Sequence, residues 1–98
     1  MRGRPIKLRL VKKEPEIRQF SPRGKIGRPG NLEIKFEEYE AIRLYDHVGL
    51  NQKDSAAHMG VSQQTFSRVL KSGRKQLAEG LVKGLIIRVA GGDFKIDK

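Results

Sequence analysis

QKDSAAHMGVSQQTFSRVL, residues 52–70, has the spacing of two short helices joined by a tight turn. Gly60 stands where such a turn needs a left-handed backbone, which glycine adopts without steric cost. Ala56 leaves room for the close approach of the two helices, and Val61 can insert the turn into the core. Ser62 is a favourable N-cap because its hydroxyl can accept from a free backbone N–H. The spacing predicts a helix-turn-helix, which presents one helix to the DNA major groove; the alternative is an ordinary helical hairpin.

The second helix of this unit is predicted over residues 63–83, ending at Gly84, and has two faces. Its buried face is marked by an apolar stripe that runs through Phe66, Val69, Leu70, Gly73, Leu77, Gly80 and Leu81. Because glycine is unfavourable inside a helix, we expect Gly73 and Gly80 to permit the close approach of another helix or strand. The opposite face is polar and basic, with Gln64, Arg68, Lys71 and Lys75. Such a face suits a phosphate backbone, although solvated helices often show the same pattern.

A further helix is predicted over residues 36–48, ahead of a helix over 52–59. Tyr39, Ile42 and Tyr45 recur every three residues, which favours core packing for both tyrosines. Three acids, Glu37, Glu38 and Glu40, suit the positive end of the helix dipole, and we expect a solvated helix start rather than a catalytic cluster. The fold class is therefore mainly α within an α+β protein, with a three-helix core over residues 32–84.

The N-terminal segment, residues 1–31, is predicted to be a basic arm and linker. Ile6, Leu8 and Leu10 alternate with basic residues, which indicates a strand with one wet face. Residues 14–31 hold three of the four prolines and read as a loop or extended linker. We expect Ile17 and Phe20 to anchor this linker to the domain. Leu32 to Lys35 is short and is expected to be extended.

Residues 85–98 are predicted to form a C-terminal β-hairpin or wing. Gly91–Gly92 suits a two-residue turn, and closing the chain there pairs Val89 with Phe94 and Ile87 with Ile96. All four apolar side chains then share one face. Because a two-stranded hairpin is marginal alone, the alternating strand at residues 6–10 is expected to join it, from the same chain or from a partner.

The net charge of +10 is unevenly placed. Residues 1–30 carry ten Lys and Arg against two Glu, a net charge of +8, so the excess lies in the arm. A polyanion is the natural partner of such an arm, and a solvated tail that only aids solubility is the alternative. Arg2-Gly3-Arg4-Pro5 resembles the core of an AT-hook, which lays arginines along a narrow minor groove. A loose phosphate-binding tail or a plain lead-in to the following strand is the preferred interpretation of this tetrapeptide.

Several classes of protein are disfavoured by composition. The chain has no cysteine, which excludes disulfides and thiolate metal sites, and nothing indicates secretion. No apolar run approaches the roughly 20 residues of a membrane span, so a cytoplasmic protein is expected. His47 and His58 lie on different predicted helices, and no metal site or other cofactor is expected. Without a phosphate-binding loop or nucleophile motif, the chain is not expected to be an enzyme.

The chain resembles a small family of uncharacterised bacterial and archaeal proteins that are predicted to bind DNA. The resemblance rests on blocks spread over nearly the whole chain, which include residues 20–24, 40–44, 49–50, 56–57, 59–62, 65–66, 81–82 and 91–92. In this family the helix-turn-helix is similar to region four of the sigma-70 factors, which implies a transcriptional role. The chain departs from the family pattern in lacking arm cysteines, in Lys35 where a capping threonine is common, and in Tyr45 where a small residue is usual.

Candidate contact residues follow from the way a helix-turn-helix docks on DNA. The N-terminal part of the second helix reads base edges, and its candidates are Gln63, Gln64, Ser67 and Arg68. Phosphates are expected to be bound by Gln52, Lys53, Ser62, Thr65, Lys71, Arg74 and Lys75. The arm would contribute Arg2, Arg4, Lys7 and Arg9 to the minor groove or to phosphates.

The sequence therefore favours a sequence-specific double-stranded DNA-binding protein, a transcriptional regulator that acts as a homodimer. The dimer is inferred from the small core, the marginal hairpin and the alternating strand in the arm. Two alternatives stay open at this point. One is non-specific DNA or RNA binding driven by the arm, and the other is an adaptor that docks on transcription machinery such as RNA polymerase.

Overall fold

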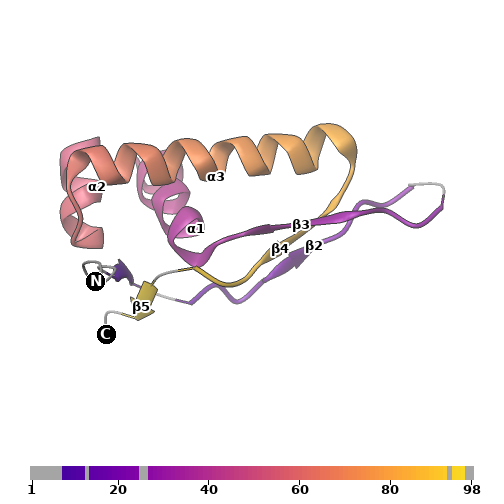
Figure 1. The fold of residues 1–98 in the computed structure, drawn as a ribbon, viewed down its shortest axis with the longest axis horizontal. Coiled ribbons are helices and arrows are strands. Elements are labelled where there is room, and N and C mark those ends of the chain that lie inside the picture. The colour runs from indigo at the N-terminus through magenta and orange to yellow at the C-terminus, as the bar shows by residue number, and fades with distance from the viewer. Residues whose placement is uncertain (1–7, 13, 25–26, 93, 97–98) are drawn as a thin grey trace, which may run out of the picture.

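In the described part of the chain, three helices lie over two small sheets (Figure 1). The computed structural model describes residues 8–12, 14–24, 27–92 and 94–96. The helices are α1 (Phe36–Ile42), continued by the π-helical segment η1 (Arg43–Val48), α2 (Gln52–Met59) and α3 (Gln63–Lys83). The strands are β1 (Arg9–Val11), β2 (Gln19–Phe20), β3 (Asn31–Ile34), β4 (Ile86–Val89) and β5 (Phe94–Ile96). The fold is α+β, and its helices occupy the predicted ranges.

The core between the helices is built by the apolar residues that the helical spacing had aligned. Ala41, Leu44, Ala56, Met59, Phe66 and Leu70 are buried together, and Val61 and Val69 pack against them. A second cluster joins Val11, Phe36 and Val89, with Phe94 stacked against Phe36 at a ring-centroid distance of 4.5 Å. The first cluster fixes the three helices relative to one another, and the second fastens the strands to the start of α1.

The C-terminal strands do not form the predicted hairpin. β4 lies between β2, to which it is antiparallel, and β3, to which it is parallel, whereas β5 pairs in parallel with β1. Val89 is therefore opposite Ile34 rather than Phe94, and Ile87 is opposite Leu32 and Phe20 rather than Ile96. The alternation along β4 was predicted correctly, since Ile87 and Val89 are buried and Arg88 is exposed. Only the pairing was wrong.

The reason lies in Gly91–Gly92, which carries the chain across the N-terminus of α1. The backbone N–H of Phe36 donates to the carbonyl oxygen of Gly91 at 3.1 Å. A Cβ atom on Gly92 would lie 2.9 Å from the Cβ of Lys35 and 1.9 Å from a carboxylate oxygen of Glu37. Gly92 thus allows a close crossing, and the chain continues as β5 beside β1 instead of folding back on β4.

The arm is held by its own chain, because β1 pairs with β5. The expected anchors of the linker were wrong: Ile17 and Phe20 are 59% and 55% exposed. Phe20 lies on β2, which is an edge strand of the three-stranded sheet within the described residues. The arm is fastened instead by the fully buried Val11.

The three acids at the start of α1 are buried, so the expectation of a solvated helix start was wrong. Glu40, 0% exposed, accepts from the backbone N–H of Lys12 at 2.8 Å and from the guanidinium of Arg43 at 2.7 and 3.0 Å. These hydrogen bonds raise the pKa of Arg43. Glu38 accepts from the backbone N–H of Lys35 at 2.8 Å and from the Ser72 hydroxyl. The arm and α3 cover this end of α1, and the buried carboxylates of Glu38 and Glu40 are hydrogen-bonded to these covering segments as well as to residues next to them in the chain.

Two glycines on the apolar stripe of α3 set its distance from its neighbours, as predicted. A Cβ atom at Gly73 would lie 2.9 Å from the Cβ of Glu38 on α1. At Gly80 it would lie 2.6 Å from Cγ1 of Ile87 on β4. α3 therefore approaches a helix at one glycine and a strand at the other.

Gly73→Ala is expected to lower the free energy of unfolding by about 1–2 kcal/mol, because overpacking at the α1–α3 contact exceeds the gain in helix propensity. Urea unfolding followed by circular dichroism measures the change. The exposed Ala78→Gly on the same helix is the control for propensity alone and should cost about 1 kcal/mol. A Gly73→Ala variant more stable than the parent would show that α1 and α3 are not in close contact there.

Candidate nucleic-acid interface

The turn between α2 and α3 has the local structure that residues 52–70 predicted. Gly60 adopts φ +67°, and the backbone N–H of Val61 donates to the carbonyl oxygen of Ala56 at 3.0 Å. Ser62 caps α3, its hydroxyl oxygen accepting from the backbone N–H of Thr65 at 3.1 Å. Asn51 caps α2 in the same way through the N–H of Asp54, at 2.7 Å. Hydrogen bonds thus define the turn at the end of α2 and at the start of α3.

The four residues predicted to read bases are all exposed on the N-terminal half of α3, namely Gln63, Gln64, Ser67 and Arg68. The guanidinium of Arg68 donates to the Thr65 hydroxyl oxygen at 3.3 Å, and the Ser62 hydroxyl donates to the same oxygen at 3.1 Å. The Arg68 bond is long, exposed and made to a neutral group, so it is worth at most about 1 kcal/mol. Arg68 is therefore free to exchange this partner for a stronger acceptor.

The residues predicted to bind phosphate differ in how they are held. Lys71 and Lys75 are exposed on α3, and no ion pair within the described part of the chain engages either of them. Lys53 is exposed at the start of α2, where Gln52 beside it is half-buried. The hydroxyls of Ser62 and Thr65 are already joined in the cap of α3.

Arg74 stands apart from this group. Its guanidinium forms an ion pair with the carboxylate of Asp46 on η1 and lies 5.2 Å from the centre of the Tyr45 ring. The hydrogen bonds of this pair lower the pKa of Asp46 and raise that of Arg74. Arg74 thus ties α3 to η1, on a different side of the helix from Lys71 and Lys75. Asp46 and Arg74 are 28 residues apart, and no local pattern marks them as partners.

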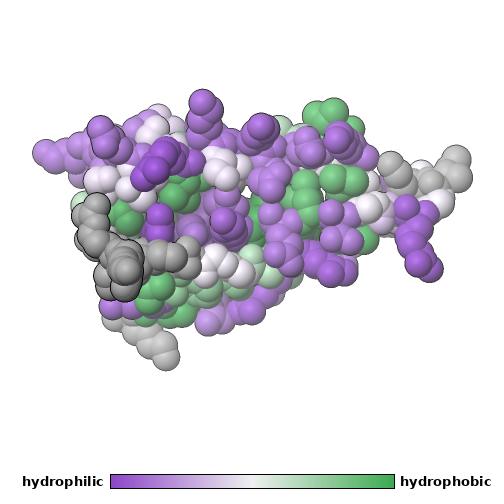
Figure 2. All heavy atoms as spheres, in the orientation of Figure 1, coloured by the Kyte–Doolittle hydropathy of each residue, from purple (hydrophilic) through white to green (hydrophobic). Residues whose placement is uncertain are grey.

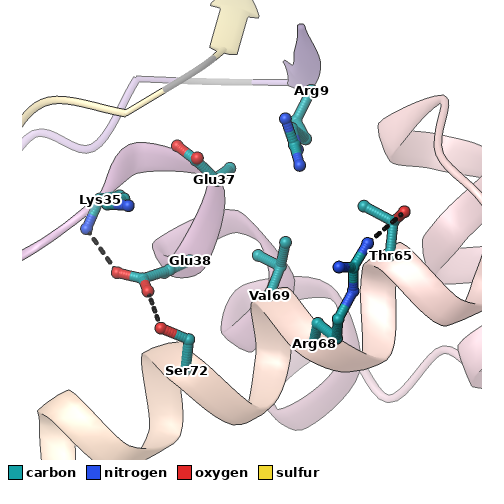
Figure 3. A pocket seen from close by; sticks show the side chains of 8 residues that line it. All are labelled: Arg9, Lys35, Glu37, Glu38, Thr65, Arg68, Val69 and Ser72. Carbon is teal, nitrogen blue, oxygen red and sulfur yellow. Dashed lines mark hydrogen bonds between the residues drawn. The ribbon is translucent and has the colours of Figure 1, made fainter. Parts of the chain in front are cut away.

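A polar cavity of about 210 Å³ lies beside the first half of α3, between this helix, β1 and the start of α1 (Figure 3). Figure 3 shows Arg9 projecting from β1 toward the side of α3 that carries Thr65 and Arg68. The arm thereby brings one of its predicted cations next to the base-reading candidates, a proximity that the sequence did not reveal. The other arm candidates, Arg2, Arg4 and Lys7, lie outside the described residues.

His47 and His58 are both exposed, and no three His, Asp or Glu side chains gather as metal ligands among residues 8–12, 14–24, 27–92 and 94–96. Over the same residues, no helix is long and apolar enough to span a membrane.

Comparisons with known proteins identify relatives but no activity. The sequence profile of a family described as "Protein of unknown function DUF134" matches residues 1–97. A "UPF0251 protein" of Methanococcus vannielii is 39% identical over 101 residues, which cover 99% of this chain and 75% of the relative. A "UPF0251 protein" of Halothermothrix orenii is 45% identical over 97 residues, covering 98% of this chain and 72% of the relative. No solved structure matches the chain.

Proposed function

The chain belongs to the DUF134 family of uncharacterised archaeal and bacterial proteins, and we propose that it is a sequence-specific double-stranded DNA-binding protein that regulates transcription. One observation carries the proposal. A capped turn holds α2 against α3, and the N-terminal half of α3 exposes Gln63, Gln64, Ser67 and Arg68 while its other face is buried. This is the arrangement in which a helix-turn-helix offers its second helix to the major groove.

Gln64 and Arg68 would carry most of the base discrimination. They lie four residues apart, so they share one side of α3. Glutamine can bond an adenine edge with two hydrogen bonds and arginine can do so with guanine, each pair contributing about 1–3 kcal/mol of discrimination. Two such side chains one helical turn apart would read neighbouring base pairs on the floor of the groove.

Phosphate binding would come from the residues around this reading face. Lys71 and Lys75 continue the exposed side of α3 beyond Arg68, and Lys53 stands at the start of α2. Each phosphate that a lysine neutralises releases counterions, which makes binding salt-dependent. Arg74 is omitted from this set because Asp46 already pairs with it.

A second candidate function, non-specific binding to DNA or RNA, is favoured by the net charge of +8 in residues 1–30. In that case the arm would supply the affinity and α3 would only be part of a scaffold. The resemblance to region four of the sigma-70 factors leaves a third outcome, docking on RNA polymerase with weak binding to naked DNA.

Fluorescence anisotropy separates these functions. The full chain is titrated into a labelled duplex from the region upstream of its own gene and into a scrambled duplex across a salt series, with structured RNA as competitor. A preference for the upstream duplex that persists near physiological salt supports specific recognition. Equal affinities with a steep salt dependence would assign binding to the arm, and capture of polymerase with weak DNA binding would favour the adaptor.

A further inference from the structure

The C-terminal half of α3 exposes large apolar side chains that the core does not use. Leu81 and Val82 are 77% and 84% exposed, and Leu77 is 39% exposed. Figure 2 shows apolar atoms at the end of α3 and in the space between this half of the helix and the sheet. Because Leu77 and Leu81 are four residues apart, they project on the same side of α3. Val82 points about 100° further round the helix.

A groove of about 370 Å³ opens on the Leu77 side of α3. Its walls are mainly apolar and come from the helices and the three-stranded sheet, with Phe20, Tyr39, Ile42, His47 and Leu77 among the lining residues. Phe20, the aromatic residue that does not anchor the linker, forms part of this wall and is 55% exposed. The groove and the protruding Leu81 are thus neighbours on one face.

The arginines around this face are neutralised within the chain. Arg43, which lines the groove, is paired with Glu40 at 2.7 Å, and Arg74, three residues before Leu77, is paired with Asp46. Arg18, two residues before Phe20, is paired with Glu14 at 2.5 Å. Nucleic acid would gain little from such a face. In a chain of net charge +10, it is a surface on which two copies can meet with little repulsion.

We propose that a second copy of this chain docks here, each copy placing Leu81 in the groove of the other beside Leu77 and Phe20. A protruding side chain next to a groove on one face is self-complementary, as a two-fold dimer requires. The polar and basic face of α3 lies roughly a third of a turn around the helix from Leu77 and Leu81. It carries Gln64, Arg68, Lys71 and Lys75. The dimer would therefore leave both reading faces open.

This interface differs from the one that the sequence suggested. The strands then invoked for dimerisation, in the arm and at the C-terminus, pair with each other inside one chain. The interface proposed from the structure uses α3 and the groove instead. It does not depend on DNA binding, although two copies of α3 would suit a two-fold symmetric operator.

The test is sedimentation velocity of the full chain at micromolar concentration, without DNA and at high salt, where electrostatic contacts are screened. The parent is expected to be a dimer. Leu81→Glu should raise the dimer dissociation constant by roughly 100-fold or more, because both copies lose an apolar contact and gain a buried charge. Val82→Glu is the matched control. Val82 is adjacent to Leu81 and at least as exposed, but it points away from the groove, and the substitution introduces the same charge. It should remain a dimer.

A monomeric parent, a Leu81→Glu variant that stays dimeric, or equal dissociation of both variants would each overturn the proposal. Circular dichroism and melting temperatures check that Leu81→Glu is folded, and Leu81→Ser should weaken the dimer less than Leu81→Glu does. Because no DNA is present, the result is separate from the proposed function. A dimer without specific DNA binding would refute only the function, and a monomer that binds DNA specifically would refute only the dimer.

Discussion

Arg68→Ala is expected to lower the affinity for the preferred duplex by roughly 5- to 150-fold, the loss of one bidentate base contact of about 1–3 kcal/mol. The affinity for a scrambled duplex should change little, because there Arg68 has no guanine edge to contact. The substitution should leave the fold intact, since Arg68 is exposed and, among the residues that the structure describes, is hydrogen-bonded only to the Thr65 hydroxyl. Anisotropy titrations with both duplexes at one salt concentration give the two affinities.

Lys75→Ala is the matched control for Arg68→Ala. Lys75 lies seven residues further along the same exposed side of α3, where phosphate is the expected contact. Its loss should weaken binding to both duplexes by a similar factor and reduce the slope of log affinity against log salt by about 1. If Arg68→Ala and Lys75→Ala affect all duplexes alike, the division of α3 into a reading part and a phosphate-binding part is wrong.

Glu40→Ala is expected to lower the free energy of unfolding by about 3 kcal/mol, near the lower end of the range for breaking a buried ion pair. Glu40 is 0% exposed and accepts hydrogen bonds from Arg43 and from the backbone of Lys12. Its loss removes the acceptor of the Lys12 backbone N–H, which is one of the contacts that hold the arm on α1. Arg43 is partly exposed and can be rehydrated, which limits the cost. Urea unfolding followed by circular dichroism measures it.

Two controls separate burial from charge in this experiment. Glu40→Gln keeps the shape and one acceptor, so it should cost less than Glu40→Ala. Glu79→Ala removes an exposed carboxylate from an i,i+4 pair with Lys83 and should change stability by less than about 1 kcal/mol. If Glu40→Ala and Glu79→Ala have the same small effect, the buried network is not what holds the arm.

The helices were predictable because their signals are local. The positions of Asn51, Gly60 and Ser62 define the ends of α2 and the start of α3 through contacts within five residues, and the apolar spacing defines their faces. The strand alternation at residues 86–89 and 94–96 was equally local. The pairing of these two strands could not be predicted locally, because Gly91–Gly92 suits both a tight turn and a close crossing of another segment. Only the position of α1 decides between these two.

The electrostatic partners were the least predictable part of the site. Glu37, Glu38 and Glu40 have the pattern of a solvated helix start, and only the covering arm and α3 make them buried. Arg74 has the spacing of a DNA-contacting residue but is paired with a carboxylate from a different helix. The exposure of the candidates on the first half of α3 was predicted correctly, since it follows from the buried stripe opposite them.

Selection from a library of random duplexes tests whether α3 reads sequence. The full chain is used to enrich bound duplexes over several rounds near physiological salt, and the enriched duplexes are then titrated beside scrambled ones. We predict a short enriched motif, bound about 10³-fold or more tightly than scrambled DNA, whose preference at one position is lost with Arg68→Ala. Failure to enrich any motif, with affinity set only by duplex length and salt, would contradict the assignment of this protein as a sequence-specific regulator.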